Sequence, residues 1–111
     1  MKPDYSARLY LVLGLGESGL AMVRWLLRCG ALVRVADSRA TPPGIETLRE
    51  TCTGAELVCG PFSSVLLDGV DVVALSPGLS IHTPLLREAH SRGIPVCGEI
   101  ELFAQALVSL G

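Results

Sequence analysis

The chain has 111 residues, of which 50% are hydrophobic and 18% are charged. This length fits one domain with its own core, and the apolar content excludes a disordered tail, a coiled coil and a collagen-like rod. Nine basic and eleven acidic residues give a formal net charge of −2, so no excess of Lys and Arg exists to neutralise nucleic acid. The chain is also short for an enzyme that uses a nucleotide and a second substrate.

Cysteine spacing and hydropathy argue against a metal site and a membrane span. No two of the four cysteines form C-x-x-C, and both histidines lie far from them in the sequence. We therefore expect reduced cysteines that pack as small hydrophobes, with no metal ligands. No apolar run approaches the roughly 20 residues of a membrane span. The sequence thus predicts no membrane partner and a cytoplasmic location.

Short apolar runs alternate with helical patterns along the chain. The first run, Leu9–Leu13, is continuously apolar, as is typical of a strand buried on both faces. The following segment, Ser18–Cys29, has apolar residues at helical spacing. The predicted strands are 9–13, 32–36, 55–59, 70–75 and 94–97. The predicted helices are 18–29, 45–52, 83–91 and 99–110, with one helical turn at 63–67.

This alternation predicts an α/β fold, with a Rossmann-like, doubly wound, five-stranded parallel sheet and helices on both faces. The strand order that we expect is 3-2-1-4-5. The order then reverses between the first and fourth strands, and ligands bind at the carboxyl edge of the sheet beside that point.

A glycine-rich segment follows the first predicted strand. Gly14-Leu15-Gly16-Glu17-Ser18-Gly19 matches G-x-G-x-x-G between a strand and a helix. In this motif Gly14 permits a tight turn, Gly16 lets backbone approach a phosphate, and Gly19 lets the helix pack on its strand. The helix N-terminus favours an anion. The alternative is a turn that needs glycine for packing only.

An acid and a base follow the second predicted strand. Asp37 stands where Rossmann domains usually meet ribose hydroxyls, and Arg39 follows two residues later. Arg39 could receive a 2′-phosphate, but Asp37 would repel it, so the pair suits a nucleotide with free ribose hydroxyls. Alternatively, Asp37 caps a turn and Arg39 is a solvated surface charge.

A third candidate segment, Ser76-Pro77-Gly78, follows the fourth predicted strand. Its hydroxyl and glycine amide could hold a phosphate from the side opposite the glycine loop, although Pro-Gly is also an ordinary turn. The chain contains no G-x-x-x-x-G-K-[ST] loop and no recognisable catalytic constellation. We therefore predict a nucleotide-binding module with no catalytic residues of its own.

Together the motifs resemble the N-terminal domain of the UDP-N-acetylmuramoyl-L-alanine:D-glutamate ligases, the MurD branch of the Mur ligase family. The resemblance covers nearly the whole chain. It rests on four segments in order: Gly14-Leu15-Gly16-Glu17-Ser18-Gly19, Asp37-Ser38-Arg39 with Pro42-Pro43-Gly44, Leu75-Ser76-Pro77-Gly78, and Gly98-Glu99-Ile100-Glu101-Leu102-Phe103.

The resemblance implies a site for a UDP-sugar rather than for NAD. Glu17 and Ser18 would lie by the diphosphate and uridine, although a carboxylate there must point outward. Asp37, Ser38 and Arg39 would surround the uracil and ribose. Diphosphate contacts would come from the Ser76-Pro77-Gly78 segment. The complete set of implied binding residues is Gly14, Gly16, Glu17, Ser18, Gly19, Asp37, Ser38, Arg39, Ser76, Pro77 and Gly78.

The resemblance also implies a larger parent enzyme of peptidoglycan synthesis. That enzyme adds D-glutamate to UDP-N-acetylmuramoyl-L-alanine through an acyl phosphate, using ATP, magnesium and a carbamylated lysine. All of this machinery belongs to central and C-terminal domains that are absent from this chain. Residues 1–98 would form the UDP-sugar-binding domain, and 99–111 a helix leading towards the ATP-binding domain. We expect the fragment alone to be inactive and to contain no cofactor.

Two alternatives remain open from the sequence. One is an NAD-binding Rossmann domain of a dehydrogenase or ligand-sensing module, and the other is an oligomerisation module with a vestigial loop. The last helix carries Ile100, Phe103, Ala104 and Leu107 on one face. Exposure of apolar residues there, such as Phe103 or Leu107, would indicate that the helix normally packs on another domain.

Overall fold

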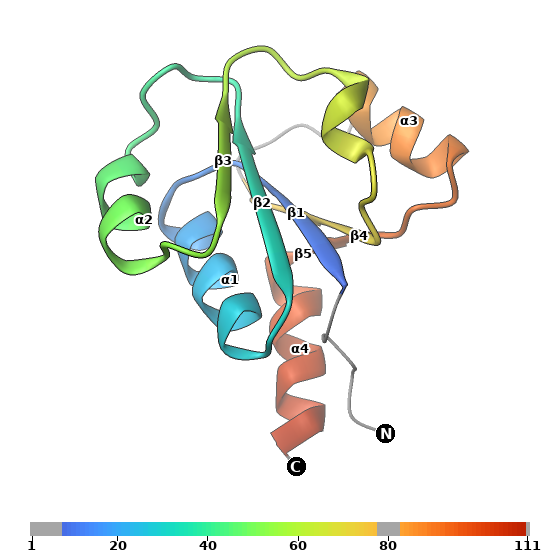
Figure 1. Ribbon diagram of the computed structural model, residues 1–111. Helices are drawn as coiled ribbons and strands as arrows, with labels where there is room; N and C mark the ends of the chain where they lie inside the picture. The colour runs from blue at the N-terminus through green and yellow to red at the C-terminus, as the bar shows by residue number, and fades with distance from the viewer. Residues whose placement is uncertain (1–7, 78–82, 111) are drawn as a thin grey trace.

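Five parallel strands form one sheet in the order β3-β2-β1-β4-β5 (Figure 1). The computed structural model describes residues 8–77 and 83–110, with side chains described up to residue 104. The predicted fold class and strand order are confirmed. The strands are β1 (Leu9–Leu13), β2 (Leu32–Asp37), β3 (Glu56–Cys59), β4 (Val72–Leu75) and β5 (Val96–Gly98). The helices are α1 (Glu17–Arg28), α2 (Ile45–Thr51), α3 (Pro84–Ser91) and α4 (Glu99–Leu110), with a 3-10 helix η1 (Ser64–Leu67).

Helices cover both faces of the sheet, so its central strands are buried on both sides. Alternate residues of β1 point to opposite faces. Val12 belongs to the core beneath α1, α2 and α4, whereas Leu11 and Leu13 belong to the core beneath α3 and η1 (Figure 1). All three side chains are fully buried. This double burial explains why the first strand reads as a continuous apolar run.

The sequence predicts the element boundaries to within two residues. The fourth strand begins at Val72 rather than at the predicted residue 70, because the Val70 N–H donates to the Leu67 carbonyl at 3.1 Å and so belongs to the turn after η1. Asp71 lies between this turn and the strand: its carboxylate accepts a hydrogen bond from the Leu9 N–H, and its own N–H donates to the Leu9 carbonyl, both at 2.8 Å. The fifth strand begins at Val96, after Pro95, which has no N–H to donate to a ladder. The carboxyl ends of the strands, which border the site described below, lie close to where the pattern places them.

Helix α4 differs from its predicted apolar face. Leu102, which that face leaves out, is the residue buried in the core, at 1% exposure, whereas Ile100 is 84% exposed. Phe103 is half-buried, and Ala104 is exposed. The reason is that α4 starts directly at the end of β5, so the strand fixes the rotation of the helix. The side chain of Leu107 lies outside the described residues.

All four cysteines are free, as predicted, and two of them are buried. Burial raises the pKa of Cys97 to about 11, so this thiol stays protonated and packs as a small hydrophobe. In the described ranges no group of three or more His, Cys, Asp or Glu side chains could hold a metal ion. Within the same ranges, no helix is long and apolar enough to cross a bilayer.

Candidate functional site

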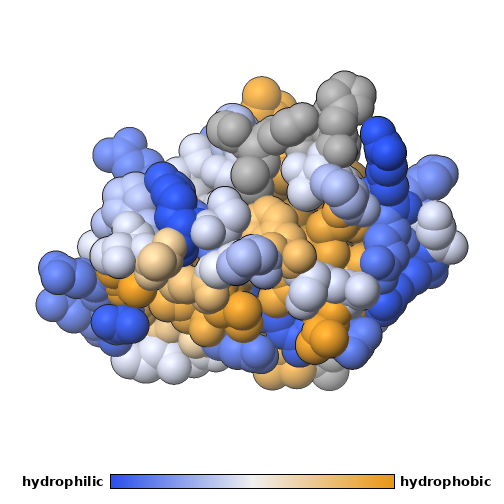
Figure 2. Space-filling model, turned by 90° about the horizontal axis from the view of Figure 1, so that it is seen from above, coloured by the Kyte–Doolittle hydropathy of each residue, from blue (hydrophilic) through white to orange (hydrophobic). Residues whose placement is uncertain are grey.

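A pocket of about 350 Å³ opens at the carboxyl edge of the sheet, where the strand order reverses. Figure 2 looks onto this edge and shows apolar surface in its middle, with hydrophilic surface on both sides. The pocket is built by segments that follow four different strands. Its lining residues are Gly14, Gly16, Asp37, Ser38, Arg39, Phe62 and Ser76. The structure therefore brings together the three segments that the sequence singled out.

Two glycines of the first loop are required by the fold. Gly14 has φ +95°, a conformation that other residues rarely adopt, and its N–H donates to the Ala36 carbonyl at 2.8 Å. Gly19 packs against this turn so closely that an added Cβ would lie 2.0 Å from the Gly14 carbonyl oxygen. For these two positions, packing and backbone geometry explain the glycine.

Gly16 has no such structural explanation. Its backbone is extended, at φ −108° and ψ −158°, which any residue can adopt. An added Cβ would meet no atom within 4 Å. Gly16 nevertheless lines the pocket, immediately before the N-terminus of α1, which has no side-chain cap. A side chain at Gly16 would project into open pocket space next to the free N–H groups of the helix.

Asp37 is buried, and its carboxylate accepts four hydrogen bonds. Oδ2 accepts from the Leu15 N–H at 2.8 Å and from the Arg39 Nη2 at 2.7 Å. Oδ1 accepts from the N–H and the Nε of Arg39, at 2.8 and 2.9 Å. The Arg39 guanidinium, helped by the two backbone donors, lowers the pKa of Asp37 to about 2. The carboxylate is therefore charged at neutral pH.

These contacts agree with the sequence alternative in which Asp37 caps a turn. Two carboxylate oxygens offer about four acceptor sites, and protein donors already use four. The sequence also allowed Arg39 to be a fully solvated surface charge, and the structure agrees less well with that interpretation. Its side chain is 55% exposed but is held against Asp37. Arg39 and the exposed Ser38 thus present donors to the pocket, while Asp37 holds Arg39 in place.

The remaining candidate residues lie around this pocket rather than in it. Glu17 is exposed and lines a neighbouring hollow of about 430 Å³ between α1 and α2. Ser18 is half-buried in the first turn of α1. Pro77 lines another hollow, of about 320 Å³, towards α4, and Ser76 borders both that hollow and the main pocket. Gly78 lies outside the described residues.

Phe62 is a pocket residue that the motifs do not indicate. It follows β3, and no glycine motif or charged pair marks its segment. Only the strand order could have indicated Phe62, because the carboxyl ends of all parallel strands meet at the same edge of the sheet. In the order found here, β3 is next to β2, so the segment after β3 comes beside Asp37.

The chain is a Rossmann-like domain with a pocket at the carboxyl edge of its sheet, and solved structures share this fold. Shikimate dehydrogenase from Aquifex aeolicus aligns with a TM-score of 0.64 at 17% identity, over 97% of this chain and 48% of its own. A glyoxylate reductase from Paecilomyes thermophila aligns with a TM-score of 0.60 at 22% identity, over 86% of this chain and 28% of its own. Identities this low show a common fold and no more.

Sequence comparison gives the family. Residues 8–98 match the family described as "Mur ligase MurD-like, N-terminal domain", and the chain belongs to it. The UDP-N-acetylmuramoylalanine–D-glutamate ligases of Aromatoleum aromaticum and Paraburkholderia phymatum are 56% and 53% identical over 91% and 97% of this chain. That of Nitrosomonas europaea is 44% identical over 94%. The chain spans 22% of the length of each of these relatives.

Proposed function

We propose that this chain is the substrate-binding N-terminal domain of a UDP-N-acetylmuramoyl-L-alanine:D-glutamate ligase of peptidoglycan synthesis, and that its pocket binds the UDP part of the substrate. Three observations support the proposal: the family membership, the convergence of three sequence segments on one pocket, and the geometry of Gly16. The last of these carries most weight, because neither the backbone nor the packing of the protein explains this glycine.

The chemistry of the pocket suits an anionic nucleotide. The uncapped N-terminus of α1 offers backbone N–H groups and the positive end of the helix dipole to a diphosphate. Ser76 adds a hydroxyl on the side of β4, and Arg39 adds a guanidinium on the side of β2. Glu17, whose charge would repel a diphosphate, borders the hollow between α1 and α2 instead. This position supports a Glu17 carboxylate that points away from the diphosphate.

We assign uracil and ribose to the Asp37-Ser38-Arg39 segment, and the diphosphate to the glycine loop and the Ser76-Pro77-Gly78 segment. The ribose contact comes from Ser38 or Arg39, because the Asp37 carboxylate is already bonded to four protein donors. In NAD-dependent Rossmann domains, by contrast, the acid at this position accepts a hydrogen bond from the ribose. This difference favours a UDP-sugar over NAD.

The remainder of the proposal concerns the parent enzyme. There, the terminal phosphate of ATP would be transferred to the substrate carboxylate to give an acyl phosphate, and the D-glutamate amine would displace phosphate from it to form the amide. The residues that would hold ATP and magnesium belong, in our proposal, to domains outside this chain. In our proposal residues 1–98 bind the UDP-sugar, residues 99–111 lead to the ATP-binding domain, and the fragment alone does not catalyse. The four free thiols support a reducing, cytoplasmic location.

A titration followed by amide chemical shifts tests the proposal. UDP-N-acetylmuramoyl-L-alanine is expected to shift the amides of Gly14, Gly16, Ser38 and Ser76, whereas NAD at the same concentration is expected to leave them in place. Gly93, on the turn after α3 and away from the pocket, serves as the internal control. Shifts of the pocket amides by NAD alone would refute the UDP-sugar assignment and favour a dehydrogenase-type module. Shifts by neither ligand, even at millimolar concentrations, would favour an interaction module.

A further inference from the structure

The pocket residues form a row along the carboxyl edge of the sheet. Ser76 follows β4, Gly16 follows β1, Arg39 follows β2 and Phe62 follows β3, and these four strands are consecutive neighbours. Neighbouring strands are roughly 4.8 Å apart, so the row from β4 to β3 is roughly 14 Å long. An extended nucleoside diphosphate has a comparable length. A ligand of this kind can therefore contact all four segments at once.

The chemistry changes along this row. At β4 and β1 the row offers a hydroxyl and the N-terminus of α1, which suit phosphate. At β2 it offers the donors of Ser38 and Arg39, which suit ribose. At β3 it ends with Phe62, the one aromatic side chain among the described residues that line the pocket. Of the parts of a nucleoside diphosphate, the base is the one with a flat face that an aromatic ring can cover.

The backbone that carries Phe62 is fixed to the neighbouring strand. Cys59 is in register with Asp37 at the ends of β3 and β2. The next residue, Gly60, donates its N–H to the Asp37 carbonyl at 2.9 Å, and Pro61 restricts the following backbone dihedral. The Phe62 ring is half-buried against the core beneath α3 and η1. These contacts hold the ring beside the segment to which we assign the uracil and the ribose.

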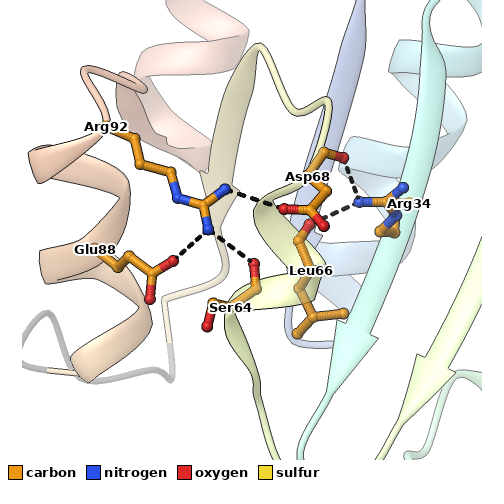
Figure 3. A network of polar contacts seen from close by, with 6 residues as sticks. All are labelled: Arg34, Ser64, Leu66, Asp68, Glu88 and Arg92. Atoms are coloured by element: carbon orange, nitrogen blue, oxygen red, sulfur yellow. Dashed lines mark hydrogen bonds and ion pairs between the residues drawn. The ribbon is translucent and has the colours of Figure 1, made fainter.

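The other end of the Phe62 segment is also fixed, by two arginines that bind η1 from opposite sides (Figure 3). Arg34 of β2 donates to the carbonyls of Leu66 and Asp68, at 2.8 and 3.0 Å. Arg92, after α3, donates to the Ser64 carbonyl at 3.5 Å and to the Asp68 carboxylate, just after η1, at 3.2 Å. Because both ends of the segment are held, little ordering is needed when a ligand meets Phe62.

We propose that Phe62 contacts the nucleobase and supplies the preference of this pocket for a nucleoside diphosphate over a bare diphosphate. The inference rests on the proposed function, since it takes UDP as the ligand, and it adds a specificity-determining residue to that site. Removing an aromatic ring that contacts a base is expected to weaken UDP binding about tenfold, which corresponds to about 1.4 kcal/mol.

Titrations of this chain with UDP and with inorganic pyrophosphate test the inference. The variant Phe62→Ala is expected to bind UDP about tenfold more weakly than the unaltered chain and to bind pyrophosphate equally well. Phe103→Ala is the matched control, because Phe103 is the only other phenylalanine, is half-buried on α4 and does not line the pocket. This control is expected to change neither affinity. Equal UDP affinity of Phe62→Ala and the unaltered chain would overturn the inference.

A second measurement needs no variant, so it holds even if Phe62→Ala does not fold. With UDP bound to the unaltered chain, nuclear Overhauser effects are expected between the uracil protons and the Phe62 ring. Uracil effects to other residues without any to Phe62 would overturn the inference and leave the proposed function intact. A chain whose pocket amides are not shifted by UDP at all would instead refute the proposed function, and the inference with it.

Discussion

The Arg39 guanidinium folds back onto the carboxylate of Asp37, two residues earlier in the chain, with Nε 2.9 Å from Oδ1 and Nη2 2.7 Å from Oδ2. The same carboxylate accepts the N–H of Leu15, in the glycine loop, at 2.8 Å. Leu15 is also bonded through its carbonyl, which accepts the Gly44 N–H at 3.2 Å. Asp37 therefore joins the glycine loop to the segment after β2 and fixes the position of the Arg39 side chain.

The charge of Asp37 is expected to stabilise the fold above about pH 4. Its pKa is about 2 in the folded chain and about 3.9 in an unfolded one. The folded state therefore binds the proton less tightly, and the stabilisation, about 2 kcal/mol, is present above the unfolded pKa and disappears as pH falls from about 4 to about 2. Denaturant unfolding between pH 2 and 7, followed by the fluorescence of the single tryptophan, Trp25, measures this dependence.

The variant Asp37→Asn distinguishes the contribution of this carboxylate to the pH dependence of stability from the contributions of the other acidic residues. It keeps the shape and one oxygen of the side chain but removes the charge that pairs with Arg39. The variant is expected to be less stable at pH 7 and to show a smaller loss of stability between pH 4 and pH 2. Glu56→Gln is the control, because Glu56 is 57% exposed in its ion pair with Arg34. An unchanged pH profile in Asp37→Asn would show that the ion pair with Arg39 does not form in solution.

Substitutions at Gly19 and Gly16 are expected to have opposite consequences. In Gly19→Ala the new methyl group would lie 2.0 Å from the Gly14 carbonyl oxygen, so α1 must move away from β1. Overpacking of this kind costs about 1–3 kcal/mol or more. In Gly16→Ala the methyl group enters open pocket space, so stability is expected to change by less than about 0.5 kcal/mol while UDP binding is weakened.

Thermal unfolding and a UDP titration of both variants check this pair. A Gly19→Ala chain as stable as the unaltered one would contradict the close contact with Gly14. A Gly16→Ala chain that binds UDP with full affinity would show that the ligand does not approach the backbone at Gly16.

The hydrogen bonds from Arg34 to backbone carbonyls are expected to stabilise the fold more than the ion pair of Arg34 with Glu56. The Arg34 side chain is mostly buried, at 17% exposure, and its guanidinium donates to two carbonyls at the end of η1. Removing charged donors from such carbonyls costs about 1.5–3 kcal/mol, so Arg34→Ala is expected to destabilise the chain by about that amount. The exposed pair with Glu56 is worth about 0–1 kcal/mol. Urea unfolding of Arg34→Ala and Glu56→Gln compares the two, and equal losses would contradict the role given to the carbonyl contacts.

The sequence predicts the fold well because local and global signals agree. Each central strand is buried on both faces and is a short apolar run, and the turns between elements carry Gly or Pro. The pocket segments after β1, β2 and β4 were predictable because glycine, charge and Pro-Gly mark them. Phe62 was not predictable from its own segment, because a single aromatic residue after β3 can be placed at the pocket only once β3 is known to lie next to β2.

Side-chain geometry was the other part that the sequence could not supply. Asp37 occupies the position typical of a ribose ligand, but the direction of the Arg39 side chain determines whether the carboxylate is free to act as one. The buried side of α4 was also missed. Leu102 and Ile100 are both apolar and two residues apart, so the pattern cannot say which of them faces the sheet; the rotation imposed by β5 decides it.

The last prediction uses this contrast between Ile100 and Leu102. Ile100 is 84% exposed, whereas Leu102 is 1% exposed. In this chain Ile100→Ser is expected to change the free energy of unfolding by less than about 0.5 kcal/mol, and Leu102→Ser is expected to cost at least about 2 kcal/mol, the low end of the range for large-to-small core substitutions.

In a full-length ligase the prediction for Ile100 changes. If the exposed side chain of Ile100 packs on the domain to which, in our proposal, α4 leads, Ile100→Ser lowers the rate of D-glutamate addition although the N-terminal domain remains folded and binds UDP normally. Steady-state kinetics of the full-length variant, together with a UDP titration of the 111-residue chain, measure both effects. Full ligase activity in Ile100→Ser would show that this side chain is not buried between domains, because burying a serine in its place would lose most of the apolar contact.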